Sequence, residues 1–254
     1  MKKILKIVLK MCRFILLLIL VIGITGAIAK NIYSEILINQ FKSQGVYQPD
    51  LSTDKVKIYH IESDETEPTI IMKGNKITPG NAGDILISLE LKLDNELIGG
   101  VVSFFAGGHA GIVLGDYVDK QGSANNDFLL ESTGFGDQTD SFVFNKNYWY
   151  DDRITPFDEV IALRVKTTEE ERSKVIAKAM ALVGEPYNYS FFFNTKEASY
   201  CTDIVGKAYS EIGVDLNKDT LTTSVYDLLI SGETYISYYY YMDNNGVKHF
   251  YYLV

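Results

Sequence analysis

The first hydrophobic block of the chain spans residues 14–29 and contains no charge, whereas five cations and no acidic residue precede it. As a helix this block covers about 24 Å, and it approaches the roughly 30 Å hydrocarbon core of a bilayer when Arg13 and Lys30 extend toward the two interfaces. The pattern predicts either an uncleaved membrane anchor or a signal peptide cut near Ala29, where Ala27 and Ala29 supply small residues. Both alternatives place the rest of the chain outside the cytoplasm.

Beyond this block the apolar positions predict strands and short helices. Alternating or continuous apolar runs indicate five strands, at residues 56–61, 85–87, 110–114, 127–132 and 161–165. Residues 32–41 are typical of a helical stalk, and the apolar run at residues 97–105 is typical of a short helix that Gly107 and Gly108 end. Residues 137–160 carry no clear period and are expected to form loops.

The second half of the chain carries clearer signals for element ends. Thr167 and Glu170 fit a capping box that opens a helix, and Gly184 ends it. A further helix is expected over residues 201–212, with its apolar positions on one face. Residues 235–254 are rich in tyrosine and have Asn-Gly at their centre, which predicts a β-hairpin.

The succession of strands, helices and strands predicts an α+β fold. The expected organisation is a membrane anchor or signal peptide at residues 1–30, a stalk and N-terminal extension at 31–78, a main domain at 79–231 and a tyrosine-rich hairpin at 232–254.

Charge excludes one class of partner. The chain has 24 basic and 33 acidic residues, and the first 29 residues hold five of the basic ones and none of the acidic ones. The remainder therefore carries 19 basic and 33 acidic residues, a net charge of −14. Because phosphates would repel such a surface, nucleic acid is not an expected partner.

Cysteine usage points to a reactive thiol. Cys201 is the one cysteine after Lys30, so the exported part of the chain cannot form an internal disulfide. Such a thiol is either buried and inert or kept for its chemistry. Its predicted position in the first turn of a helix favours a thiolate, because unpaired backbone N–H groups and the helix dipole stabilise negative charge there.

A thiol nucleophile requires a base, and the chain has three histidines, His60, His109 and His249. His109 lies between the Gly107–Gly108 break and a buried strand, so it is the histidine expected at the edge of a cleft. One exported cysteine and three scattered histidines do not form a zinc site, and no phosphate-binding glycine loop occurs, so neither a metal nor another cofactor is predicted.

These segments resemble a known family. The sequences GDIL at 83–86 and GHAGIVLG at 108–115 resemble strand motifs of the NlpC-type papain-like cysteine hydrolases. The cysteine segment YCTDIVGKAYSEIGVDL at 200–216 follows these strands instead of preceding them, which resembles the circularly permuted YiiX-like branch. LLES, VIALRV and GEPYN occur in the order of that branch. The resemblance implies a papain-like antiparallel sheet packed against helices.

The resemblance also implies catalytic roles. Cys201 would be the nucleophile, His109 its general base and Glu131 the group that orients His109; the alternative for Glu131 is a solvent-facing strand residue. Tyr187 resembles a pocket tyrosine of the family, although it fits a core position equally well. Asp84 is expected to cap a turn. Two positions depart from the family pattern, since Thr202 follows the nucleophile in place of serine and Asn188 replaces an aspartate.

The preferred functional hypothesis is a thiol peptidase or amidase that forms a thioester intermediate and acts on cell-wall peptides, that is, peptidoglycan. It would be bound to a bacterial cell membrane, or secreted if the N-terminal segment is cleaved. A second hypothesis is a lipid-directed thiol hydrolase or acyltransferase, which gains support if residues 97–105 form an exposed apolar patch near the cleft. A third is an inactive binding module. The terminal hairpin is open to three roles: a lid, a partner surface or an extension of the sheet.

Overall fold

The computed structural model describes residues 2–63, 67–69, 72–73, 76–77, 80–90, 96–118, 124–132, 141–144, 149, 157–190, 197–217 and 222–254. Its centre is a nine-stranded sheet of order β1-β2-β11-β10-β9-β5-β6-β7-β8, with β3 and β4 paired separately. The strands are β1 (Val46–Tyr47), β2 (Val56–Ile61), β3 (Met72–Lys73), β4 (Lys76–Ile77), β5 (Ile85–Ser88), β6 (His109–Val118), β7 (Ala124–Ser132), β8 (Ser141–Phe144), β9 (Glu159–Val165), β10 (Thr234–Met242) and β11 (Lys248–Leu253). The helices are α1 (Lys2–Ser43), the 3-10 turn η1 (Pro49–Leu51), α2 (Glu96–Ala106), α3 (Glu169–Ala181), α4 (Cys201–Ser210) and α5 (Val225–Ile230).

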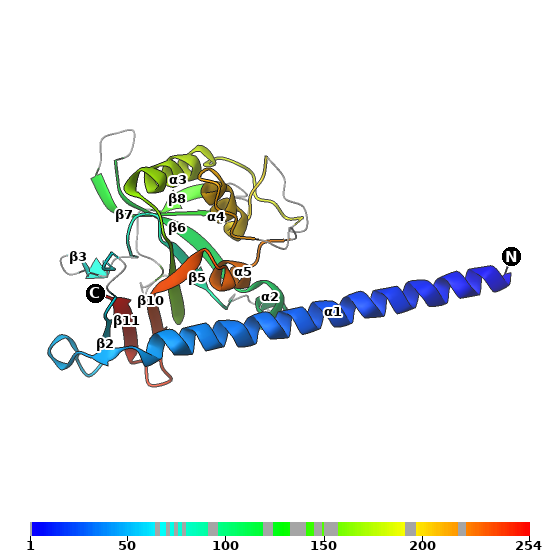
Figure 1. Cartoon of the computed structure of the whole chain (residues 1–254), viewed down its shortest axis with the longest axis horizontal. Coiled ribbons are helices and arrows are strands. Elements are labelled where there is room, and N and C mark those ends of the chain that lie inside the picture. The colour runs from blue at the N-terminus through cyan, green and yellow to red at the C-terminus, as the bar shows by residue number, and fades with distance from the viewer. Residues whose placement is uncertain are drawn as a thin grey trace.

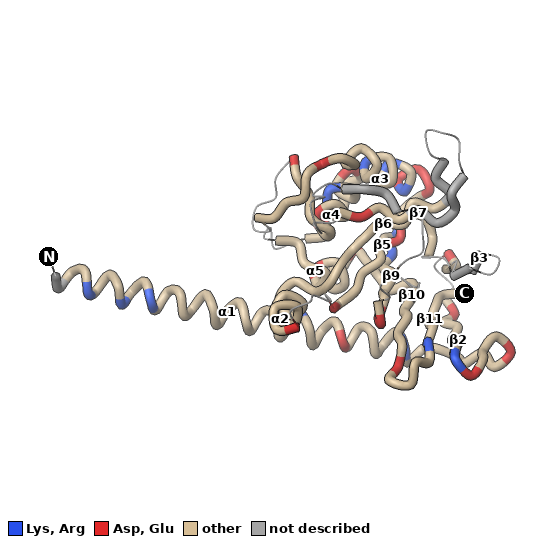
Figure 2. The backbone as a smooth tube through the Cα atoms, turned by 180° about the vertical axis from the view of Figure 1, so that it is seen from behind, with Lys and Arg blue, Asp and Glu red and all other residues tan. Residues whose placement is uncertain are grey.

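The predicted anchor and stalk form one continuous helix, α1, of 42 residues. Its first half extends away from the body and its second half lies along the body (Figure 1). The helix is long and apolar enough to cross a membrane, and none of its most apolar window is buried inside the protein. The charges in the projecting half lie near its beginning, and an uncharged stretch separates them from the body (Figure 2).

The second half of α1 packs through one narrow stripe. Ala27, Ser34, Ile38 and Phe41 are buried, at spacings of seven, four and three residues that keep them on one side of a helix. At the start of this stretch the Lys30 ammonium lies 2.5 Å from the Asp227 carboxylate of α5. The residues between the predicted anchor and the predicted stalk are therefore part of the packed structure.

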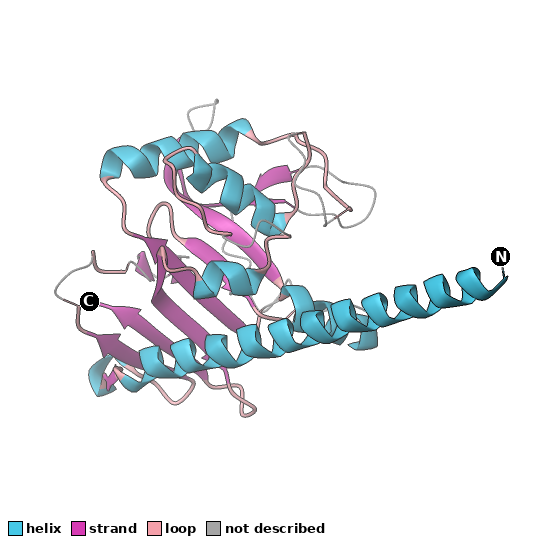
Figure 3. Cartoon of the chain, turned by 45° about the vertical axis from the view of Figure 1, so that its right-hand side comes forward, coloured by secondary structure: helices cyan, strands magenta, loops and turns pink. Residues whose placement is uncertain are grey.

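The sheet has a buried core on each face. Helices α1, α3, α4 and α5 cover one face (Figure 3), where Ile85 and Ile87 of β5 pack. Leu86 points to the opposite face, among Val113, Trp149 and other apolar side chains. The alternation of one strand between two cores follows from its period of two residues, and it explains why residues 85–87 are continuously apolar.

Several boundaries differ from the sequence prediction. The third predicted helix is capped by Thr168 and Glu171, one residue later than expected, because Thr167 still hydrogen-bonds the Val165 carbonyl at the end of β9. Helix α4 ends at Ser210 instead of residue 212, because the backbone hydrogen bonds of the following turn join each N–H to the carbonyl three residues earlier, as in a 3-10 helix. Strand β8 and helix α5 were not predicted, because each is too short to show a period.

The terminal hairpin extends the sheet. Strands β10 and β11 pair antiparallel, and β11 pairs parallel with β2, so the hairpin connects the first part of the chain to β9. Its aromatic rings stack on one another: Tyr59 lies over Tyr251 with ring centroids 4.2 Å apart, and Tyr241 lies over His249 at 4.5 Å. Tyrosine content here is explained by packing within the sheet.

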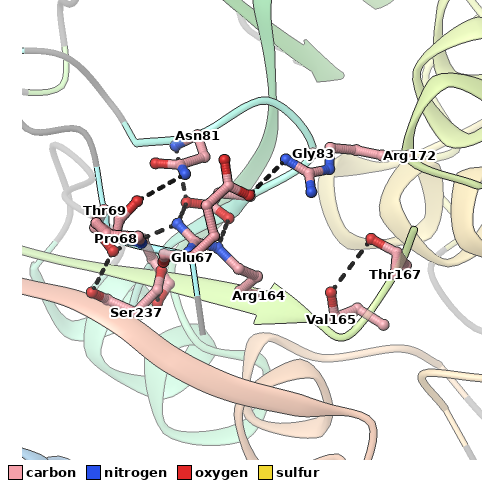
Figure 4. Close-up of polar contacts among 12 residues, drawn as sticks. Glu67, Pro68, Thr69, Asn81, Gly83, Arg164, Val165, Thr167, Arg172 and Ser237 are labelled. Atoms are coloured by element: carbon pink, nitrogen blue, oxygen red, sulfur yellow. Dashed lines mark hydrogen bonds and ion pairs between the residues drawn. The ribbon is translucent and has the colours of Figure 1, made fainter. Parts of the chain in front are cut away.

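A buried ion pair connects β5 to β9. Arg164 Nε lies 2.7 Å from Asp84 Oδ1 and its Nη2 lies 2.9 Å from Oδ2, a bidentate arrangement. Figure 4 shows Arg164 among the polar contacts that also involve Glu67, Thr69 and Asn81. Asp84 also accepts a hydrogen bond from the Asn81 N–H at 2.9 Å, which confirms that it caps this turn. Arg164 further donates to the Glu67 carbonyl, so the pair holds residues 67–69 against the sheet.

We predict that Arg164→Met destabilises the protein by about 3–5 kcal/mol, because it leaves the Asp84 carboxylate buried without its partner. Urea unfolding of the full chain in detergent, followed by circular dichroism, measures this loss. The matched control is Lys174→Met, which breaks the exposed pair with Glu170 and should leave the unfolding midpoint nearly unchanged. Equal midpoints for the two variants would contradict the prediction.

Candidate active site

Cys201 is the first residue of α4, and its side chain is partly exposed. Two contacts hold this end of the helix: the Thr202 hydroxyl donates to the Thr223 carbonyl at 2.6 Å, and the Tyr200 hydroxyl accepts from the Thr223 N–H at 2.9 Å. At this position the backbone N–H of Cys201 has no carbonyl of the same helix to bond. The thiol and that N–H therefore lie at the positive end of the helix dipole.

His109 is the first residue of β6, and two glycines before it make its position possible. Gly107 has a φ of +79°, and a Cβ at Gly108 would lie 2.3 Å from the Glu90 carbonyl oxygen. A side chain would be strained at Gly107 and would clash at Gly108. Because both residues are glycine, the chain can turn sharply from α2 into β6. The turn brings the buried His109 imidazole close enough to the side chain of Cys201 for the cysteine to help raise the pKa of the ring.

Glu131 lies on β7, next to β6, and is fully buried at 0% exposure, so it is not the solvent-facing residue of the alternative prediction. Its Oε2 lies 2.7 Å from His109 Nε2, and its Oε1 accepts a hydrogen bond from Trp149 Nε1 at 2.6 Å. A Cβ at Gly111 would lie 3.1 Å from the Glu131 Cγ, so the absence of a side chain there leaves room for the carboxylate. With Nε2 bound to Glu131, Nδ1 is the ring nitrogen left for Cys201.

The charge balance favours a protonated imidazole. Burial by itself would lower the pKa of His109, but the Glu131 carboxylate and hydrogen bonds to Cys201 and Glu131 outweigh it and raise this pKa to about 10. Because the folded-state pKa is raised, the resulting stabilisation is complete below the unfolded value of about 6.5 and is lost as the pH rises through about 10. At neutral pH an imidazolium thus lies between the side chains of Glu131 and Cys201.

Trp149 is the residue of this site that the sequence analysis missed. Its ring is fully buried and stacks near the imidazole of His109, with centroids 5.7 Å apart, while Phe157 packs against the indole at 4.4 Å. Trp149 falls in the stretch expected to be loop, where no period marks it. The available signal was composition, because it is the one tryptophan in the chain.

The remaining histidines lie elsewhere in the sheet. His249 belongs to β11 and His60 to β2, and β10, β9 and β5 separate β11 from β6. His60 Nε2 lies 2.7 Å from the Tyr252 hydroxyl. Within the described part of the chain, no group of three or more His, Cys, Asp or Glu side chains is arranged to hold a metal ion.

Comparison with known proteins identifies the family to which the chain belongs. The model of the family described as "Permuted papain-like amidase enzyme, YaeF/YiiX, C92 family" matches residues 81–229, more than half of the chain. The chain belongs to this family. Among solved structures, a crystal structure described as the metalloprotein yiiX of Escherichia coli O157:H7 is 15% identical, with a TM-score of 0.44, and covers 61% of this chain and 95% of its own. No curated protein is significantly similar to the chain.

The segment matched by the C92 model contains Cys201, His109 and Glu131, whereas α1, β2 and the terminal hairpin lie outside it. This chain thus extends the sheet of the C92 segment by a further hairpin and places a long helix beside it. The four strands β1, β2, β10 and β11 therefore lie outside the matched segment.

The other predicted positions near the cysteine have separate roles. Tyr187 is half-buried, lies close enough to Cys201 for their charges to interact and has a raised pKa, chiefly because of burial. Asn188, where an aspartate was expected, is buried and accepts hydrogen bonds from the Ser190 N–H and hydroxyl, so it shapes a turn. Asp84 lies at the end of β5 opposite to Ser88, the residue paired with His109, and so lies away from the cysteine.

We predict that Trp149→Phe costs about 1.5–3 kcal/mol of stability, because it removes the hydrogen bond to a buried carboxylate while keeping a ring. It should also slow alkylation of Cys201 at neutral pH, since Glu131 is then less firmly placed against His109. Chemical unfolding and iodoacetamide labelling measure the two effects. Phe157→Leu, which trims the same aromatic cluster but keeps the hydrogen bond, should retain the labelling rate; an equal slowing in both variants would refute the role of Trp149.

Proposed function

We propose that this protein is an extracytoplasmic cysteine amidase in which Cys201 is the nucleophile, His109 the general base and acid, and Glu131 the orienting carboxylate. The observation that carries the proposal is the chain of contacts from the Cys201 thiol through the His109 ring to the Glu131 carboxylate. A nucleophile, a base within hydrogen-bond reach and a third group that orients the base are the parts that thiol catalysis requires.

The proposed reaction has two halves. The Cys201 thiolate attacks the carbonyl carbon of an amide, and the oxyanion that forms accepts a hydrogen bond from the Cys201 backbone N–H. The C–N bond then breaks, the His109 imidazolium gives its proton to the departing amine, and a thioester remains. Neutral His109 next takes a proton from water, the hydroxide breaks the C–S bond, and the acid leaves as the thiolate and imidazolium are restored.

We further propose that α1 is a retained membrane anchor. Ala27 is buried against the body, Lys30 pairs with Asp227, and the Asn31 side chain donates to the Phe104 carbonyl at 3.0 Å. The helix continues without a break across Ala29, so cleavage there would cut a packed helix. This supports a single-pass protein with its body outside the cytoplasm, in line with the cations that precede the apolar block.

Location favours cell-wall peptides as substrates, because the body would lie between the membrane and the wall. A second candidate substrate is a membrane lipid that carries an amide or ester. The observation that favours it is the exposure of apolar side chains on α2, three residues before His109: Leu97 is 78% exposed and Val101 52%. This is the exposed apolar patch by which the lipid hypothesis gains support.

We predict that iodoacetamide labels Cys201 at neutral pH at least tenfold faster in the unsubstituted site than in the His109→Ala variant, because a cationic imidazole stabilises the thiolate. The full chain is used with Cys12→Ser, which removes the other thiol, and Cys201→Ser serves as the blank. Glu131→Gln should also slow labelling, since burial would then dominate the pKa of His109 and lower it.

A labelling rate that His109→Ala leaves unchanged would remove His109 from the mechanism and favour an inactive binding module. Labelling tests the nucleophile without knowledge of the substrate.

The substrate class is tested separately, with the full chain in liposomes. We expect soluble wall stem peptides to be cut at an amide bond, and Cys201→Ser to abolish the cleavage while leaving the fold unchanged. Product amines are quantified by mass spectrometry, in parallel with an N-acyl phospholipid supplied in the same liposomes. Release of a fatty acid from the phospholipid, without peptide cleavage, would transfer the proposal to the lipid substrate.

A further inference from the structure

Helix α2 has its polarity reversed relative to a helix on the surface of a soluble domain. Four of its large apolar side chains, Leu97, Ile98, Val101 and Phe105, are exposed, whereas Val102 and Phe104 are half-buried and Gly99 is buried. A surface helix of a soluble domain turns its apolar stripe toward the core and leaves small or polar residues outside. An uncharged apolar face that is exposed next to an apolar anchor is typical of a surface that contacts a membrane or another protein.

The inner face of α2 is built from small residues. Gly99, Gly100 and Ser103 recur at helical spacing, and they line a cavity of about 720 Å³ between α2 and α1. The Asn31 amide connects the two helices directly through its hydrogen bond to the Phe104 carbonyl.

The two helices expose apolar residues at the same level. Ile28 and Ile32 flank the Asn31 contact on α1, and both are exposed. α2 lies beside α1 where the anchor leaves the body (Figures 1 and 3). With 11 residues α2 is about 16 Å long, too short to cross a bilayer but suited to lie in its interface.

We propose that the outward face of α2, formed by Leu97, Ile98, Val101 and Phe105, docks into the bilayer that holds α1. The inference rests on the proposed anchor, since only a membrane-held chain brings α2 to the lipid surface. The surface that this face contacts is the outer leaflet of the membrane, because the face continues the apolar surface of α1 and carries no charge that would select a protein partner.

Docking of α2 determines how far Cys201 and His109 lie from the membrane surface. Only Gly107 and Gly108 separate α2 from His109, so the imidazole lies within about 11 Å of chain from the lipid-contacting helix. Val225 at the start of α5 packs against this turn, since a Cβ at Gly107 would lie 2.5 Å from its Cβ. The turn is therefore stiff, and the catalytic groups are held near the membrane surface instead of at the end of a free stalk.

The test uses the full chain with Cys12→Ser and Cys201→Ser, so that single cysteines can carry a nitroxide spin label. Val101→Cys and Leu97→Cys report on α2, Ile19→Cys reports on the projecting half of α1, and Leu51→Cys reports on the far end of the body. All four native residues are exposed, so the labels should not disturb packing. The protein is reconstituted in vesicles of phosphatidylethanolamine and phosphatidylglycerol.

Collision of each label with oxygen, which concentrates in lipid, is compared with collision with a water-soluble nickel complex. We expect the ratio of the two rates to be severalfold higher at Val101 and Leu97 than at Leu51, and close to the ratio at Ile19. A lipid signal at Ile19 with an aqueous signal at Val101 and Leu97 would overturn the docking of α2 and leave the anchor in place. An aqueous signal at Ile19 would overturn the anchor itself. Low collision with both reagents at Val101 would overturn lipid docking in favour of a second copy of the chain.

Discussion

A carboxylate enclosed inside the protein, Glu131, sets the main constraint on the candidate active site. A buried charge is tolerated only when its oxygens are bound, and here His109 and Trp149 each bind one of them. Burial by itself would lower the pKa of His109, but the carboxylate outweighs this effect and helps to raise that pKa to about 10, so the imidazole stays protonated. Removal of any one of these three side chains leaves a polar group of another buried without its partner.

The rest of the fold brings the thiol to this charge pair. Strands β6 and β7 carry the two charged groups, and α4 packs on the same strands. The start of α4 is fixed by Thr202 and Tyr200, which both bond to Thr223 ahead of α5. The ion pair between Asp84 and Arg164 stiffens the opposite end of the sheet. The site thus depends on a rigid frame at both ends of its strands.

Elements outside the segment that the family model matches determine how the site is oriented relative to α1. Strand β11 pairs with β2, and β2 follows α1 through a short connection, so the hairpin ties the long helix to the sheet. Lys30 and Asn31 fasten α1 to α5 and α2. The candidate site therefore has a fixed orientation relative to the helix that extends from the body, which suits the proposed enzyme at a membrane surface.

Sequence by itself determined the features that depend on neighbouring residues. The apolar block, the period of the strands and the position of Cys201 at a helix start all follow from local pattern. The family resemblance then suggested His109 and Glu131 as partners of Cys201. Tertiary structure decided the rest: the hydrogen bond from Trp149 to Glu131, the continuity of α1 through its ion pair, and the outward face of α2. Periodicity shows which face of an element is apolar, but only the folded chain decides what that face meets, because contacts between distant segments depend on how the whole chain closes.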